Sequence, residues 1–180
     1  MSGLNYCFTQ LTDHERVQCG AYKTGGIDSI AIIDSDANIS NYASAAAWQT
    51  AIDAENVKII KGIKAEFPEG SKIEGENPIA CGAETVLDGH DFTIVLKDFN
   101  VSAVNDEFWA TANGQSYYVA YRLCNEDEIV VIELPVTVKA TQAIVPMSNK
   151  EKQYYAVTLE FSADANWYPA RYAEPAAIFD

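Results

Sequence analysis

The sequence predicts a mainly β fold with some α structure: an antiparallel β-barrel or sandwich with a flanking helix, preceded by an extra N-terminal arm and a short helix. Three observations lead to this fold class. From residue 57 onward, apolar and polar residues alternate with a period of two, which is typical of half-buried antiparallel strands. Two short segments have helical spacing instead. The 180 residues are 48% apolar, which is enough to build one domain with a core of its own.

Residues 1–56 are predicted to form the arm, a short strand and a helix. About the first thirty residues follow neither period and contain four glycines, as an extended arm or loop would. The apolar run Ser29–Asp34 then predicts a strand. The alanine-rich segment Asn41–Ile52 predicts a helix anchored by Trp48, with Ser40 as its N-cap, because alanine is the best helix former.

Residues 57–165 are predicted to form the core. The alternating segments Val57–Phe67 and Asp91–Phe99 predict two strands. The segment Ala103–Ala112 predicts a second helix, with Ser102 as its N-cap and a glycine two residues beyond its end. On the first strand, one face is expected to carry Val57, Ile59, Lys61, Ile63, Ala65 and Phe67.

Further strands are expected to follow the second helix in quick succession. They cover Ser116–Cys124, Glu128–Glu133, Leu134–Val145 and Lys152–Ala163. Pro135 fits only the beginning of the third strand or an edge, because proline has no N–H to donate to a ladder. The short polar turn before Glu128 predicts a hairpin between the first two strands.

Residues 166–180 form an aromatic tail that the sequence predicts to be irregular. Exposed aromatic residues often mark contacts between proteins. Five are therefore candidate subunit contacts, two on the polar faces of strands and three in the tail: Tyr118, Tyr154, Trp167, Tyr168 and Tyr172. The three in the tail fit two arrangements equally well, since they could also pack against the barrel of their own chain. The inward-pointing tyrosines of the strands are expected to belong to the core.

The formal net charge of −14, from 12 Lys+Arg against 26 Asp+Glu, argues against a basic nucleic-acid-binding protein. No apolar run approaches the ~20 residues of a membrane helix, so we expect no membrane partner. The first residues lack the basic and apolar regions of a secretory signal. We therefore expect the cysteines to stay reduced.

No motif in the sequence indicates an enzyme, a cofactor site or a metal site, and we expect none of the three. The sequence contains no GxGxxG, Walker loop, GxSxG or HExxH. Its cysteines and histidines form no CxxC or HxxxH pair, the spacings typical of structural zinc; they are Cys7, Cys19, Cys81, Cys124, His14 and His90. The segment Asp34–Asn38 looks like the start of a calcium loop, but Ile39 and Ala45 replace the required glycine and glutamate.

The order of elements from Val57 to Ala163 resembles that of bacteriophage tail-tube and tail-hub proteins, which share a fold with the ring-forming tube proteins of type VI secretion. The matching parts are the two strands before the second helix, that helix, and the strands after it. The ending Tyr155–Asp164 looks like the last strand of that family.

The resemblance implies a structural virion protein without catalytic residues. Its copies would form a ring, with a hexamer as the candidate symmetry, in a phage tail tube, tail hub or neck. The N-terminal arm and the aromatic tail would contact neighbouring copies or other virion proteins. DNA would pass through the ring without specific binding, and an anionic lumen would repel its backbone. Assembly would take place in the host cytoplasm.

Three alternatives remain open at this point. A small-molecule-binding β-barrel would explain the tyrosines and predicts a sizeable cavity and a monomer. A capsid decoration protein would also be a virion protein, but would not form a conduit. A hydrolase would need two carboxylates facing each other in a cleft, one of them with a raised pKa.

Overall fold

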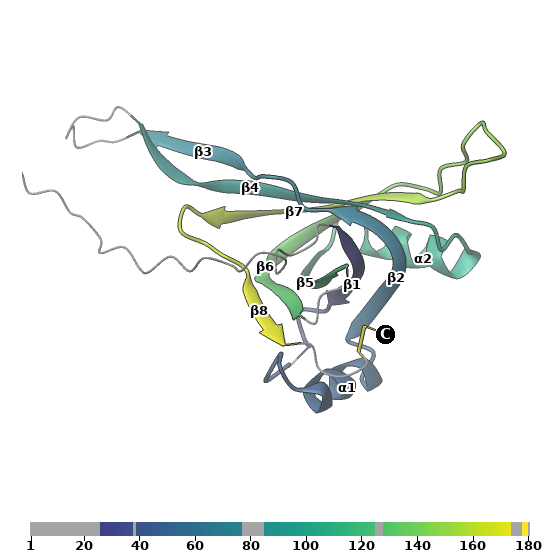
Figure 1. Cartoon of the computed structure of the whole chain (residues 1–180), viewed down its shortest axis with the longest axis horizontal. Coiled ribbons are helices and arrows are strands. Elements are labelled where there is room, and N and C mark those ends of the chain that lie inside the picture. The colour runs from purple at the N-terminus through teal and green to yellow at the C-terminus, as the bar shows by residue number, and fades with distance from the viewer. Residues whose placement is uncertain (1–25, 38, 77–84, 125–127, 174–177, 180) are drawn as a thin grey trace, which may run out of the picture.

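The computed structural model describes residues 26–37, 39–76, 85–124, 128–173 and 178–179. Within these residues, six antiparallel strands close a barrel in the order β2–β1–β5–β6–β7–β4, because β4 also pairs with β2 (Figure 1). Two further strands lie outside the barrel, β3 beside β4 and β8 beside β6. The elements are β1 (Ile27–Ile33), α1 (Ala45–Asp53), β2 (Val57–Glu66), β3 (Ser71–Glu76), β4 (Thr85–Asp98), α2 (Ala103–Ala112), β5 (Ser116–Leu123), β6 (Glu128–Ala140), β7 (Tyr155–Asp164) and β8 (Ala170–Ala173). The predicted mainly β fold with an antiparallel barrel and flanking helices is confirmed.

The barrel interior is filled by alternate side chains of its strands. Ile94, Leu96 and Leu159 are completely buried there, opposite one another on the paired strands β4 and β7. The predicted inward faces of Asp91–Phe99, Ser116–Cys124 and Lys152–Ala163 are confirmed, since their apolar members belong to this one cluster. Helix α2 lies over one end of the barrel and contributes Trp109 to the same core.

A second core lies outside the barrel wall, between strands β1, β5 and β6 and helix α1. Trp48 of α1 is fully buried there, packed edge-on against Phe179 near the C-terminus. Its indole nitrogen donates to the carbonyl of Tyr42 at 2.8 Å. Because this wall separates two cores, the segment Ile30–Ile33 is buried on both faces and is apolar throughout instead of alternating.

Strand β2 changes face in its middle, contrary to the prediction that one face carries all its alternate residues. Val57 and Ile59 belong to the outer core, whereas Ile63 and Ala65 point into the barrel. The pairing with β1 shifts register between these two halves, where Gly62 adopts a φ of 68°. Glycine reaches this left-handed conformation without steric cost, and the bulge moves the following residues to the opposite face.

Both helices begin at a capping serine. Helix α2 spans the predicted residues, and Ser102 accepts a hydrogen bond from the backbone N–H of Asn105 at 3.2 Å. The start of α1 was predicted wrongly: Ser44 caps it, and the helix begins at Ala45. The side chain of Asn41 accepts from the N–H of Ala43, so the segment before the helix forms a turn instead.

Several strands differ from the prediction in their bounds or their number; β7, for example, starts at Tyr155 instead of Lys152. β4 starts six residues earlier than expected, at Thr85, and pairs there with β3, which was not predicted. β6 is one strand where two were expected, and Pro135 lies in its middle. Its ladder with β5 shifts register at that point, so the missing N–H falls in an irregularity, which is the other place that tolerates proline. β8 lies in the tail that was expected to be irregular.

Candidate assembly surface

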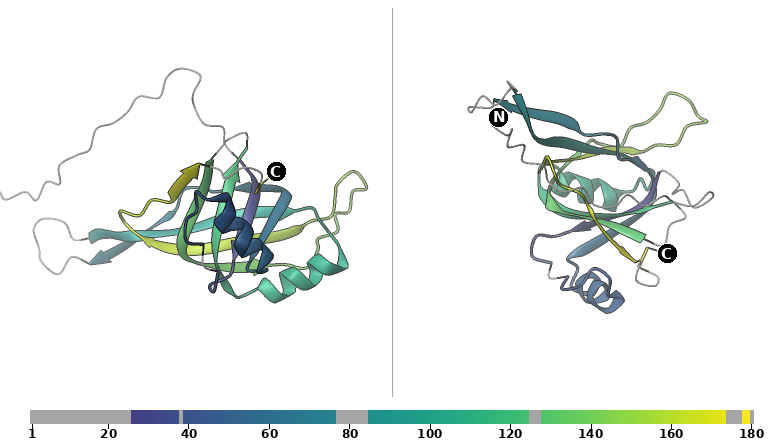
Figure 2. Two further views of the ribbon diagram at one scale, coloured as in Figure 1. Left: turned by 90° about the horizontal axis from the view of Figure 1, so that it is seen from below. Right: turned by 60° about the vertical axis from the view of Figure 1, so that its left-hand side comes forward.

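Two parts of the chain extend beyond the barrel in opposite directions. The hairpin of β3 and β4 projects on one side, and the connection between β6 and β7, residues 141–154, projects on the other (Figures 1 and 2). Both continue the long sheet that includes β4 and β7. Such extensions add little to the core of their own chain and place backbone and side chains within reach of another molecule.

The β6–β7 connection exposes three apolar side chains within four residues, those of Ile144, Val145 and Met147. Val145 is 68% exposed, and Met147 is fully exposed. The segment is held at its base by a backbone bridge between Ile144 and Tyr154. Exposed apolar groups that cluster on a projecting segment are typical of contact surfaces. Sequence analysis missed this cluster because it assigned residues 134–145 to a strand, whereas β6 ends at Ala140.

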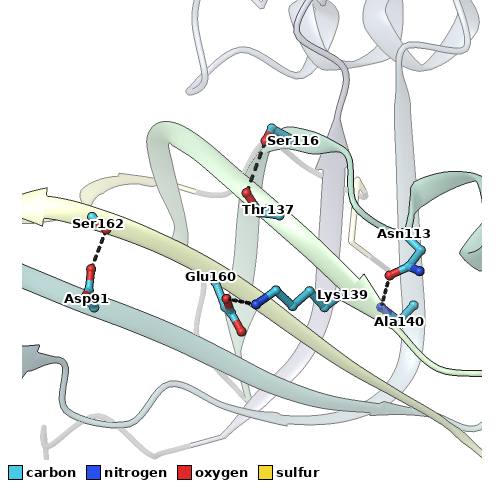
Figure 3. Close-up of polar contacts among 8 residues, drawn as sticks. All are labelled: Asp91, Asn113, Ser116, Thr137, Lys139, Ala140, Glu160 and Ser162. Carbon is cyan, nitrogen blue, oxygen red and sulfur yellow. Dashed lines mark hydrogen bonds and ion pairs between the residues drawn. The ribbon is translucent and has the colours of Figure 1, made fainter.

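The sheet between the two projections has a polar outward face (Figure 3). On β4 and β7 the outward positions carry Asp91 and Ser162, which are hydrogen-bonded. Glu160 of β7 forms an ion pair with Lys139 of β6. Further along the face, the hydroxyl groups of Ser116 and Thr137 are 3.3 Å apart. These three pairs of polar side chains are partnered across the strands, which suits a solvent-facing surface.

The tail aromatics predicted as subunit contacts differ in how they are placed. Trp167 is half-buried and packs on the rings of Phe92 and Phe161, with centroids 5.5 Å and 5.2 Å away. Tyr168, the next residue, is 84% exposed. Of the two arrangements considered for the tail, Trp167 therefore packs against its own barrel and Tyr168 faces outward.

Tyr172 and Tyr118 pack within the chain near the outer core. Tyr172 lies on β8, its ring 5.4 Å from that of Tyr42, and its hydroxyl donates to Glu133 at 3.2 Å. Burial, and secondarily this hydrogen bond to a carboxylate, raise the pKa of Tyr172. Tyr118 is half-buried against the same cluster. Tyr154 is half-buried at the base of the β6–β7 connection, between Phe99 and the amine of Lys97. A role of these residues in subunit contacts stays a prediction.

A buried polar cluster fixes α2 to the barrel end. Asp98 is 2% exposed, and its carboxyl group accepts from the indole N–H of Trp109 at 2.9 Å. It also accepts from the backbone and the side chain of Asn100, at 2.9 Å and 2.6 Å. Nearby, the hydroxyl of Tyr155 donates to Asp106 at 2.8 Å. Burial and then this bond raise the pKa of Tyr155, so it stays a hydrogen-bond donor at neutral pH.

An open hollow of about 620 Å³ lies beside this cluster, lined among others by Asp106, Trp109, Asn113 and Tyr155. The amide oxygen of Asn113 accepts from the backbone N–H of Ala140, which ties the end of α2 to β6 (Figure 3). The hollow therefore lies between a helix and the barrel rather than inside the barrel, whose interior is filled by side chains.

The residues considered for metal binding are scattered. In the described part of the chain, no three His, Cys, Asp or Glu side chains are grouped so that they could hold a metal ion. His90 lies on β4 beside Phe92, and Cys124 follows the end of β5. Cys7, Cys19, Cys81 and His14 lie outside the described residues. Among the described helices, neither is long and apolar enough to span a membrane.

Comparison with known proteins leaves the fold and this surface as the basis for assigning a function. No protein-family model, no curated protein and no solved structure matches this chain.

Proposed function

We propose that this chain is a structural, self-assembling virion protein whose copies form a ring of a phage tail tube, tail hub or neck, through which DNA passes. One observation carries the proposal: a closed barrel sends out two projections in opposite directions, and one of them exposes Val145 and Met147. A subunit with different contact surfaces on opposite sides joins its neighbours head to tail, and such heterologous contacts close into rings when the rotation allows.

The strand edges support the same function. Pairing of β2 with β4 closes the barrel, but within the described residues β3 and β8 pair on one side only. An unpaired edge is a template for another strand. In a ring, neighbouring copies would cover these edges, as the resemblance to tail-tube proteins implies.

The charge supports a conduit that DNA passes without sticking. The chain has 26 acidic against 12 basic residues. In a ring the anionic groups facing the lumen would repel the DNA backbone at the distances over which charges act at physiological salt, about 8 Å.

The test is the mass of the purified full-length chain over a wide concentration range, with electron microscopy of any oligomer. We expect rings or stacked rings, and at least a tenfold weaker assembly of Val145→Asn/Met147→Asn. The matched control is Val104→Asn, because Val104 is a 76% exposed apolar residue on α2 and belongs to neither projection. A strict monomer at high concentration, with or without the substitutions, would refute self-assembly.

A small-molecule-binding protein is the second candidate, favoured by the hollow beside α2. Its polar lining includes Asp106 and the donor Tyr155, which could orient a small polar ligand. A monomer whose thermal stability rises with added metabolites, and falls back in Tyr155→Phe, would favour this candidate over assembly.

A further inference from the structure

The outward face of the long sheet is charged differently at its two ends. Near the β6–β7 connection, Lys64 of β2 and Lys97 of β4 are direct cross-strand partners, and both are exposed. Near the hairpin, the exposed acids on this face are Asp91 of β4 and Asp164 of β7, whose strands pair there. Lys97 lies six positions after Asp91 on β4, a distance of about 20 Å.

The basic end lacks an acidic partner within the described chain. Like charges directly opposite one another destabilise a strand pair, yet neither Lys64 nor Lys97 forms an ion pair with any described carboxylate. The amine of Lys97 lies over the ring of Tyr154, 4.7 Å from its centroid. Lys139, the next cation on this face, is already paired with Glu160. Two neighbouring amines are thus available to an external anionic group.

The acidic end is equally available. Asp91 and Asp164 are exposed and form no ion pair with a described residue. The nearest cation of the hairpin, Lys72, is the strand partner of His90 and so belongs to the face opposite Asp91, because side chains alternate. The hairpin also extends past the barrel, so that a second molecule can approach it (Figure 1).

We infer that the acidic end of the sheet in one copy, formed by Asp91 and Asp164 at the root of the hairpin, docks on the Lys64–Lys97 end in a second copy of this chain. The inference rests on the proposed function and adds to it the pair of surfaces that meet. The two ends are complementary in charge and lie apart along one face of the sheet, so each copy offers one of each. A copy bound at its basic end still presents its acidic end to the next, as head-to-tail assembly requires. The net charge of −14 makes nucleic acid the poorer anion for these amines.

Charge reversal tests the inference, with the full chain and sedimentation velocity as the measurement. The basic-end variant is Lys64→Glu/Lys97→Glu, and the acidic-end variant is Asp91→Lys/Asp164→Lys. Each variant alone is expected to assemble at least tenfold more weakly than the unmodified chain, because like charges then meet. An equimolar mixture is expected to assemble again, because opposite charges meet once more in an alternating order.

The matched control is Asp36→Lys/Asp53→Lys, which changes the net charge as the acidic-end variant does but at exposed acids near α1. It should assemble like the unmodified chain. Raising the salt concentration from 0.1 M to 1 M should weaken assembly of the unmodified chain, since the screening length falls from about 10 Å to about 3 Å. Circular dichroism of every variant checks that the exposed substitutions leave the fold intact.

The outcomes separate this inference from the proposed function. An unmodified chain that stays monomeric overturns the proposed function and this contact with it. Rings that form regardless of either charge reversal overturn only the contact. If the basic-end variant loses binding to a DNA duplex but still assembles, the two lysines bind DNA phosphates rather than a second copy of the chain. That result also overturns the inference.

Discussion

Replacing Asp98 by asparagine should loosen α2 from the barrel by an amount that the hydrogen bonds predict. In the native chain one carboxyl oxygen accepts from Asn100 and the other from the indole N–H of Trp109. Asparagine keeps one acceptor and turns the other into an N–H₂ group, so one of these donors faces another donor. A buried donor without a partner costs about 1–3 kcal/mol. We expect a loss of about 2 kcal/mol in the free energy of unfolding, or a fall in Tm of about 4–8 °C for a chain of this size.

A double-mutant cycle with Trp109→Phe isolates this interaction. Phenylalanine removes the indole N–H, so Asp98→Asn should cost less in that background, with a coupling of about 1–2 kcal/mol. Urea unfolding followed by far-ultraviolet circular dichroism measures all four proteins without depending on the replaced tryptophan. Additivity within about 0.5 kcal/mol would mean that the two side chains act independently, and would refute the argument.

Three further predictions concern local backbone and ionisation. Gly89→Ala should break the β4–β7 ladder at the root of the hairpin, because the added methyl group would lie 2.4 Å from the carbonyl oxygen of Ala163. Exchange of the backbone amide hydrogens at this point of the ladder should become faster, and an unchanged exchange rate would contradict the reasoning. Ser44→Ala should lower stability by about 1 kcal/mol and Ser40→Ala by almost nothing, since only Ser44 caps α1; equal losses in chemical unfolding would contradict this. Burial raises the pKa of Tyr121 from 10.0 to about 12, so the folded state favours the neutral phenol. The neutral phenol therefore contributes about 2–3 kcal/mol to the free energy of unfolding below pH 10, and this contribution is lost between pH 10 and about 12. Tyr121→Phe should lose less stability over that range than the native chain, and parallel pH profiles would be the contrary result.

Much of the barrel could be predicted because its strands are half-buried. Alternation is visible wherever one face meets the core and the other meets water, as on β4 and β7, and the inward faces followed from it. Helix α2 was predicted with its correct bounds because a serine cap and a glycine both mark its limits. These signals are local, so a single sequence contains them.

The errors came from interactions between distant segments. The face change on β2 depends on a bulge at Gly62, and an isolated glycine does not reveal which residues it displaces. Strand β3 has few apolar residues and is ordered by pairing with β4. β8 similarly depends on the edge of β6. The exposed apolar residues of the β6–β7 connection were hidden because the predicted strand Leu134–Val145 ran past the actual end of β6 at Ala140.

The two charged ends of the sheet could not be seen in the sequence either. Lys64 and Lys97 are 33 positions apart, and only the register between β2 and β4 makes them neighbours. The sequence supplied the overall charge, whereas the pairing of strands determined where that charge accumulates.

The continuity of β4 has a mechanical consequence. The strand runs unbroken from the projecting hairpin into the barrel wall, where ten consecutive residues, Gly89 to Asp98, pair with β7. A neighbour that pulls on the hairpin therefore loads this ladder along the strand axis, and its hydrogen bonds share the force instead of opening one after another. An array of such subunits would transmit tension through its sheets while the helices carry little of it.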